Sequence, residues 1–351
     1  MLKNPNIFYY DMFKKNVYST RAEAISSNTP CYFYYYDLEF SKVDWKSEPT
    51  ESLQQLYKER AQWIRDNYDY VLLCYSGGSD SSQILESFYY NNIHIDEILV
   101  VGAMSQDKYK GSDENHNGDL YRNAFPTLNT LSFPNTKITV KDYTDYFRNP
   151  NEFTLIQKYG NDWMKEIGAF TSVHNLFWYD LKKFVGANNE KRTAVIYGSD
   201  KPRFNVDEWG RYYTDTTDLC VTDYGSNYID SNFERVNFYT DPKAEKIMRK
   251  QIHTVINYYN LLVKENKIPH EFFFEEYFSI VNRLVYEYKN PLDFMSAKST
   301  LTCFSLRDMF MKNKTDSDMF RIYREGLAKM KYEDNILVTG KKSFCTQRYY
   351  L

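Results

Sequence analysis

Residues 74–82 read CYSGGSDSS and lie between two segments of different character. The segment before them, YDYVLLCY at 68–75, is an almost continuous apolar run, which indicates a strand buried on both faces of a parallel sheet. The segment after them, SQILESFYYNN at 82–92, carries apolar residues at the spacing of one helix face. We therefore expect a glycine-rich turn that connects a buried strand to a helix.

The composition of this turn favours the binding of an anion over a merely tight turn. Gly77 and Gly78 would let the backbone approach a ligand closely and turn its N–H groups inward. The helix that follows would contribute the positive end of its dipole and its first N–H groups. Four hydroxyls would donate further hydrogen bonds to phosphate oxygens, those of Ser76, Ser79, Ser81 and Ser82.

Asp80 is the one acidic residue of the turn, and it would repel a phosphate directly. A Mg²⁺ ion between the carboxylate and the phosphates would remove that repulsion. The turn therefore predicts a nucleotide bound with its metal. The alternative for Asp80 is a helix cap, which needs no ligand.

Three further apolar segments predict strands beside the first one: IDEILVVGAM at 95–104, KITVKDY at 137–143 and TAVIYGSDKPRF at 193–204. With the helical segments between them, they predict an α/β fold of Rossmann-like type, with a parallel sheet and helices on both faces. In such sheets, ligands bind beyond the carboxyl ends of the strands. Asp200, Lys201 and Arg203 follow the third of these strands, so we expect a second metal contact from Asp200 and phosphate binding by the two cations.

The chain of 351 residues divides into three expected units: an aromatic-rich segment at 1–50, the nucleotide-binding α/β domain at 51–240 and a helical region at 241–351. Apolar residues recur at helical spacing through 247–262 in the last unit. Two more helices are expected there, at 270–288 and 318–330.

Composition narrows the functional classes. The net charge of −3 lacks the broad positive charge of a nucleic-acid binder, although a local basic patch is possible at 340–351. The five cysteines form no CxxC pair, which argues against a zinc ribbon or an iron–sulfur site. No apolar run approaches the ~20 residues of a membrane span, and the first residues lack a signal peptide's apolar core. We expect a cytoplasmic protein, in the host cytoplasm if the gene is viral.

Other nucleotide-binding motifs do not fit. The segment NILVTGKKS at 335–343 has Asn335 where a Walker A motif requires its first glycine. No GxGxxG follows a predicted strand, which argues against a dinucleotide site.

The segment YSGGSDSS at 75–82 resembles the SGGxDS signature of the PP-loop ATP pyrophosphatases, the adenine nucleotide alpha hydrolase-like superfamily. This superfamily includes the synthetase domains of asparagine synthetase, GMP synthetase and tRNA-modifying ligases. The resemblance covers about residues 55–205 and implies ATP and Mg²⁺ as ligands. It also implies cleavage of ATP between the α and β phosphates, adenylation of an acceptor oxygen, and displacement of AMP by a nitrogen or sulfur nucleophile.

Carried over by position, the resemblance assigns the pyrophosphate and its Mg²⁺ to Ser76, Gly77, Gly78, Asp80 and Ser81. We expect the catalytic roles to fall to Asp80 and, because it follows a strand end at the same edge, Lys201. It places the end of the second strand near adenine and ribose, at Val101, Gly102 and Met104. The chain departs from some relatives, because Leu2 stands where a glutaminase domain of the N-terminal nucleophile type has cysteine. The acceptor stays open, as a small molecule or a nucleic-acid base.

Three alternatives remain. CYSGG differs from the GxSxG elbow of serine hydrolases at Cys74, and His174, His253 or His270 would then supply the base. That interpretation gives no role to the carboxylate and hydroxyls that follow. A catalytically silent nucleotide-binding or structural protein with this fold is the second alternative.

The third alternative is a PAPS reductase-like enzyme, because such relatives carry a C-terminal cysteine. Cys345 has Lys341, Lys342 and Arg348 nearby in the sequence, and basic neighbours are expected to lower the pKa of its thiol. The surrounding residues SFCTQ do not follow the reductase pattern.

Overall fold

A computed structural model gives the fold. It describes residues 2–27, 29–102, 120–142, 150–165, 174–186, 190–198, 201–218, 228–229, 232–264, 281, 283–286, 321–322, 325, 328 and 344–351. In this part of the chain, no helix combines the length and the apolar character needed to cross a membrane.

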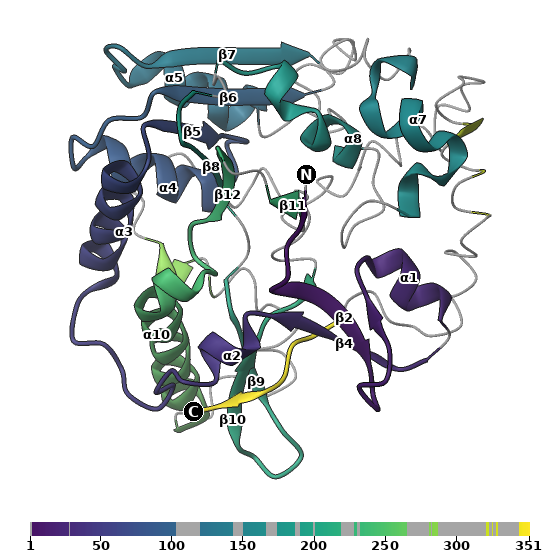
Figure 1. Cartoon of the computed structure of the whole chain (residues 1–351). Coiled ribbons are helices and arrows are strands. Elements are labelled where there is room, and N and C mark those ends of the chain that lie inside the picture. The colour runs from purple at the N-terminus through teal and green to yellow at the C-terminus, as the bar shows by residue number, and fades with distance from the viewer. Residues whose placement is uncertain are drawn as a thin grey trace.

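The largest sheet among the described residues has five parallel strands and lies in the upper part of Figure 1. Its strands are, in spatial order, β12 (Phe233–Asn237), β8 (Thr193–Tyr197), β5 (Tyr70–Cys74), β6 (Glu97–Gly102) and β7 (Lys137–Asp142). All four neighbouring pairs are parallel. The expected α/β class and parallel sheet are therefore confirmed, and the strand order is compatible with a Rossmann-like fold.

The order of the strands places a change of direction at the centre of the sheet. From β5 the chain adds β6 and β7 on one side, and later adds β8 and β12 on the other side. The carboxyl ends of β5 and β8 therefore lie side by side where the order reverses, which is where open α/β sheets bind ligands. The turn after β5 and the segment after β8 both start at this point.

Helices cover both faces of the sheet. One face packs on α3 (Leu53–Asn67), α4 (Ser79–Tyr89) and α10 (Glu245–Lys264), and the other on α7 (Thr154–Tyr159) and α8 (His174–Tyr179). The strand side chains alternate accordingly. Val71 and Leu73 belong to the first core, whereas Leu72 and Cys74 belong to the second.

The sequence explains the two longest helices. Ser52 caps α3 by accepting a hydrogen bond from the Gln55 N–H at 3.1 Å, and the expected apolar stripe of α3 is buried. The Asp241 side chain accepts from the Lys243 N–H at 2.8 Å and starts a short 3₁₀ turn that leads into α10. The helix expected through 247–262 is thus confirmed, and most of the helices expected at 270–288 and 318–330 lies outside the described residues.

Three small antiparallel sheets surround the main one. Their strands are β1 (Leu2–Lys3) with β11 (Tyr228–Ile229); β3 (Val17–Tyr18), β2 (Ile7–Asp11) and β4 (Cys31–Tyr35); and β13 (Tyr349–Tyr350), β10 (Tyr212–Asp215) and β9 (Arg203–Val206). The described residues also form the helices α1 (Arg21–Ser26), α2 (Asp37–Phe40) and α5 (Phe125–Thr130), a π-helical turn at Leu120–Ala124, and 3₁₀ turns at Pro150–Glu152, Gly160–Lys165 and Leu181–Lys183. The described end of the chain is thus extended and pairs with β10, although a helical region was expected there.

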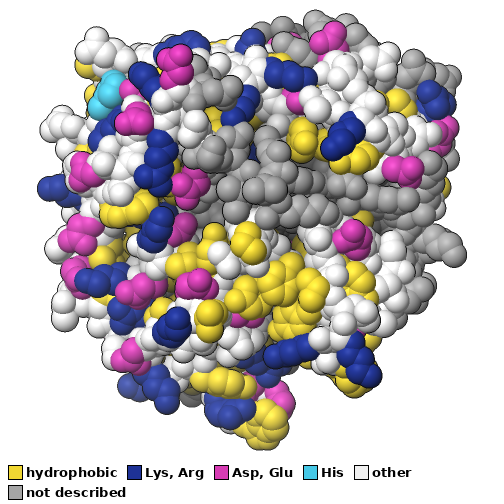
Figure 2. Space-filling view, in the orientation of Figure 1, with side chains coloured by type: hydrophobic (Ala, Val, Ile, Leu, Met, Phe, Trp, Pro, Cys, Tyr) yellow, Lys and Arg dark blue, Asp and Glu magenta, His cyan; other side chains and the backbone are white. Residues whose placement is uncertain are grey.

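The surface carries charges of both signs. Figure 2 shows basic and acidic side chains interspersed over α3 and α10, and hydrophobic side chains gathered over β2 and β4. This mixture agrees with the small net charge of −3.

Candidate functional site

The turn between β5 and α4 has the geometry that its glycines suggest. Gly77 adopts a positive φ of 76°, in the left-handed region that glycine enters without steric cost. Gly78 is the N-cap of α4, and it provides no side-chain cap. Asp80 therefore occupies the second helical position, so the suggestion that Asp80 itself is the N-cap is wrong. A helix start without a capping side chain suits an anionic ligand.

The serine hydroxyls differ in their surroundings. Ser81 Oγ accepts from the Ser76 N–H at 3.3 Å and donates to the Gly78 carbonyl at 3.2 Å, so it holds the turn together. Ser79 and Ser82 are buried, and Ser76 is exposed. The described hydrogen bonds of Ser76 lead to Ser81 and Gly78 within the turn itself. Ser76 is therefore the hydroxyl that lies nearest to solvent.

Gly198 brings the end of β8 directly against this turn. A Cβ atom at Gly198 would lie 2.7 Å from the Ser81 nitrogen and 2.9 Å from the Asp80 carbonyl carbon. Both are backbone atoms, so a side chain at this position would force the backbone to shift. Sequence reasoning missed Gly198, although a glycine at the end of a buried strand is a signal for such a close approach.

Asp80 and Lys201 meet next to the turn. Lys201 Nζ lies 2.6 Å from Asp80 Oδ1, and the Tyr286 hydroxyl donates to the same oxygen. Lys201 Nζ also donates to the Tyr286 hydroxyl at 3.0 Å and lies 4.6 Å from the centre of its ring. The exposed fractions of the three residues are 7% for Asp80, 6% for Lys201 and 4% for Tyr286. Two residues predicted from separate strand ends thus form one buried cluster with a third.

Tyr286 stays protonated in this cluster. Burial, and secondly the negative charge of Asp80, raise the pKa of its hydroxyl well above the usual value. The hydroxyl therefore acts as a donor to the carboxylate over the whole range of ordinary pH.

Two further side chains fix the backbone of the turn. The Tyr239 hydroxyl donates to the Asp80 carbonyl at 2.8 Å, and Asn123 Nδ2 donates to the Gly77 carbonyl at 3.1 Å. Sequence reasoning missed Tyr239, Asn123 and Tyr286. No local motif surrounds any of the three, so the sequence carried no signal for them.

The other predicted ligand contacts lie in different places. Val101 and Gly102 end β6, at the carboxyl edge where they were expected. Met104 and Asp200 lie outside the described residues. Arg203 Nη2 lies 2.7 Å from Asp215 Oδ1, across the β9–β10 pair, and this ion pair competes with the phosphate contact predicted for Arg203.

Cys345 contacts the same arginine. Its Sγ lies 3.2 Å from Arg203 Nη2. Burial nevertheless raises the pKa of the Cys345 thiol, and the opposing effect of Arg203 is smaller. The expected lowering of this pKa by basic neighbours is therefore wrong, because desolvation of the thiolate outweighs the positive charge. A raised pKa disfavours the thiolate that a reductase-like role needs.

The serine hydrolase alternative needs a histidine beside Ser76, and none of the described histidine side chains forms a hydrogen bond with it. His253 lies on α10, and its Nε2 is 3.0 Å from the Trp45 carbonyl oxygen. His270 and the side chain of His174 lie outside what the structure describes.

Asp80 is the carboxylate at the turn that could hold a metal bound together with a nucleotide. Among the described residues, no group of three or more His, Cys, Asp or Glu side chains is arranged to hold a metal. Mg²⁺ typically keeps several waters and binds one or two carboxylates together with substrate phosphates. Asp80, beside an uncapped helix start and a lysine, matches that type of site.

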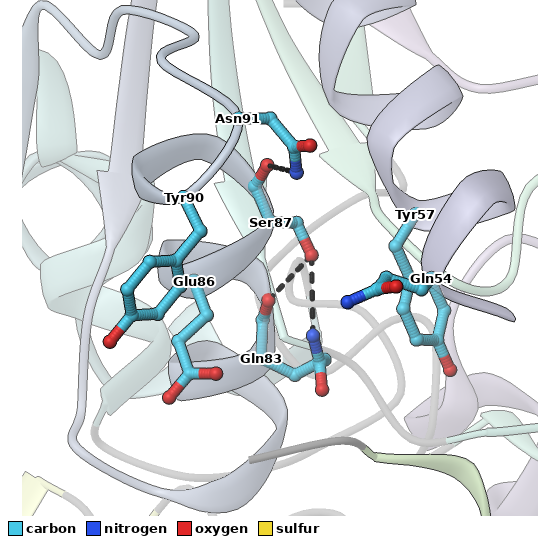
Figure 3. A pocket seen from close by; sticks show the side chains of 7 residues that line it. All are labelled: Gln54, Tyr57, Gln83, Glu86, Ser87, Tyr90 and Asn91. Carbon is cyan, nitrogen blue, oxygen red and sulfur yellow. Dashed lines mark hydrogen bonds between the residues drawn. The ribbon is translucent and has the colours of Figure 1, made fainter. Parts of the chain in front are cut away.

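A small cavity lies further along α4, past the turn (Figure 3). Gln54 and Tyr57 of α3 line it together with Gln83, Glu86 and Ser87 of α4. Its volume is about 20 Å³, which suits about one water molecule. This cavity is therefore too small for a nucleotide.

Comparisons with known proteins give no family assignment. No model of a known protein family matches the chain, and no curated protein is similar to it at a significant level. A functional assignment must therefore rest on the site itself.

Proposed function

We propose that the protein is an ATP pyrophosphatase-type enzyme that binds ATP with Mg²⁺ at the turn between β5 and α4. The observation that carries this proposal is the 2.6 Å contact between Asp80 and Lys201. It brings a carboxylate and an ammonium group together at the reversal of strand order, beside two glycines and a helix start. The resemblance of residues 75–82 to the SGGxDS signature supports the same interpretation.

Each group has a role in this proposal. The N–H groups of the turn and the Ser76 hydroxyl bind the β and γ phosphates. Lys201 moves from Asp80 to the phosphates, because a highly charged anion competes with one carboxylate for a lysine. Asp80, released from the lysine, would then hold the Mg²⁺, which would neutralise charge on the leaving pyrophosphate.

The resemblance to the PP-loop ATP pyrophosphatases implies the reaction. An acceptor oxygen attacks the α phosphorus, and the bond from that phosphorus to the oxygen bridging the α and β phosphates breaks. Pyrophosphate leaves with the bond's electron pair, and the acceptor carries AMP. A nitrogen or sulfur nucleophile then displaces AMP. Lys201 would stabilise the charge that develops on pyrophosphate, which is electrostatic catalysis by a positioned cation.

A cytoplasmic location belongs to the same proposal. Three cysteines among the described residues are free thiols, Cys31, Cys74 and Cys345, as is usual in a reducing compartment.

A catalytically silent protein is the second candidate, and one observation favours it. Asp80 and Lys201 neutralise each other and are both nearly buried, as in a structural ion pair. In a silent protein this pair would stay closed, and ATP would bind weakly or without turnover.

The products of ATP distinguish these candidates. ATP labelled at the α or the γ phosphate is incubated with the protein, Mg²⁺ and pools of metabolites and nucleic acids, and the products are separated by chromatography. We expect AMP and pyrophosphate, formed in the presence of an acceptor pool. ADP and orthophosphate as the only products would contradict the proposal. Binding without any turnover would favour the silent protein.

A further inference from the structure

We propose that Tyr286 is a positioning residue that holds the Asp80 carboxylate while Lys201 moves to the phosphates. This inference rests on the proposed function and extends it to a residue outside the glycine-rich turn. Tyr286 lies 206 positions from Asp80 in the sequence, and its hydroxyl donates to Asp80 Oδ1.

The position of Tyr286 is supported by the ring of Tyr239 and, through the preceding residue, by Tyr57. The Tyr57 hydroxyl, on α3, donates to the carbonyl of the preceding residue, Val285, at 2.8 Å. Gln251, on α10, donates to the Tyr57 oxygen at 3.0 Å. The Tyr286 ring also packs on the ring of Tyr239, with 5.6 Å between ring centres. The hydroxyl is therefore held in place independently of Lys201.

This arrangement solves an energetic problem of the proposed exchange. When Lys201 leaves Asp80, a nearly buried carboxylate loses a charged donor, and a buried acceptor that lacks hydrogen bonds is costly. The Tyr286 hydroxyl would remain on Oδ1 and keep the carboxylate in one orientation. A fixed carboxylate needs no reordering to meet the metal, which improves metal affinity.

The Tyr286 ring also provides a second contact for the Lys201 ammonium group. The ammonium group lies 4.6 Å from the ring centre, within the range of a cation–π interaction. The lysine therefore keeps a favourable contact while it changes partner.

The chain offers a matched control elsewhere. The Tyr9 hydroxyl donates to Asp218 Oδ2 at 3.2 Å, and Asp218 is paired with buried Arg21. Tyr9→Phe thus removes the same kind of hydroxyl from the same kind of ion pair, away from the turn.

The test compares wild type, Tyr286→Phe and Tyr9→Phe. ATP binding is measured by calorimetry, first in EDTA and then across a Mg²⁺ titration. Pyrophosphate release is measured as a second readout. We expect Tyr286→Phe to bind metal-free ATP as wild type does. The Mg²⁺ concentration that gives half-maximal ATP binding should rise about tenfold, and so should the concentration that gives half-maximal pyrophosphate release. A tenfold change corresponds to the smallest free energies usual for a hydrogen bond to a charged group. Tyr9→Phe should keep the wild-type Mg²⁺ dependence and lose only thermal stability.

The outcomes separate the two levels of the proposal. If wild type does not bind ATP with Mg²⁺, the proposed function fails and this inference fails with it. If wild type binds and Tyr286→Phe shows a wild-type Mg²⁺ dependence, the inference alone is wrong. Equal changes in Tyr286→Phe and Tyr9→Phe would also overturn it, since they indicate a merely structural role.

A second variant covers the case in which Tyr286→Phe does not fold. Tyr57→Phe keeps the Tyr286 hydroxyl but removes the hydrogen bond that anchors Val285. It removes two neutral hydrogen bonds, the one to Val285 and the one from Gln251, and acts on the Asp80 carboxylate only through Tyr286. The Mg²⁺ dependence should therefore shift in the same direction by about threefold. An unchanged Mg²⁺ dependence would then overturn the inference.

Discussion

Two buried groups in the molecule each combine an aspartate, a cation and a tyrosine hydroxyl, and they differ in how the aspartate is surrounded. In one group, Asp80 Oδ1 accepts from Lys201 and Tyr286 at the edge of the main sheet. In the other, Asp218 Oδ2 lies 2.6 Å from Arg21 Nη1 and accepts from Tyr9.

The second group has the features of a permanent connector. Asp218 Oδ1 accepts from the Phe344 N–H at 3.0 Å, so both carboxylate oxygens are bonded to segments far apart in the sequence. The cation is arginine, which stays charged in proteins and holds carboxylates firmly. This group joins the N-terminal segment to the end of the chain.

The first group has the features of a changeable contact. Its cation is lysine, a compact charge on a flexible stem with no preference for one bidentate geometry. Its aspartate lies in the first turn of α4, where the helix dipole stabilises a negative charge even without the lysine. The two groups therefore have similar residues but different expected roles, and their positions in the fold account for the difference.

The largest expected effect is on stability, and it should differ between the two cations. Arg21→Met leaves Asp218 buried without its cation and should lower the free energy of unfolding by about 3–5 kcal/mol. Lys201→Met should cost only about 1–2 kcal/mol, because the helix start and Tyr286 still stabilise Asp80. Urea unfolding of both variants and wild type measures the difference. Equal losses would mean that the Asp80–Lys201 pair is also a structural connector, which would favour the silent protein.

A smaller effect should come from the contact between β8 and the turn. Gly198→Ala places a Cβ against backbone atoms of Asp80 and Ser81, and we expect a loss of about 1–3 kcal/mol together with weaker ATP binding. Gly186→Ala is the control, because the three nearest atoms to its Cβ would all be side-chain atoms: Lys137 Nζ at 2.8 Å, Glu97 Oε2 at 3.1 Å and the Tyr70 hydroxyl at 3.2 Å. We expect that variant to lose stability as well, since the Glu97 side chain is buried, but to leave ATP binding unchanged. Thermal unfolding and ATP titration measure both properties. A Gly198→Ala variant that binds ATP as the control does would contradict the close approach of Gly198 to the turn.

The sequence predicted the parts of the site that local patterns encode. β5, β6 and β8 are continuous apolar runs, and the glycines mark the turn, so the meeting of Asp80 and Lys201 at one sheet edge was foreseeable in outline. β12 was missed because FERVN carries two charged residues at the edge of the sheet, where one side of the strand is less buried. An alternating edge strand gives a weaker signal than a buried central one.

The missing side chains of the site come from long-range packing. Tyr286 is one of 34 tyrosines, and nothing within its own segment marks it as a partner of Asp80. Arg203 was assigned to phosphate because it follows a strand end, but the β9–β10 hairpin places it opposite Asp215. Both cases depend on which segments pair in space, which single-sequence patterns do not encode.

The most direct test of the central claim is a Mg²⁺ titration of pyrophosphate release from ATP by wild type and Asp80→Asn, with melting curves to show that both are folded. Asparagine keeps the size of the side chain and a hydrogen-bond acceptor but removes the charge that the metal needs. We predict that Asp80→Asn requires at least about tenfold more Mg²⁺, or loses turnover, as expected for loss of a charged ligand. A folded Asp80→Asn variant with a wild-type titration would contradict the proposal that Asp80 holds the metal of a bound nucleotide.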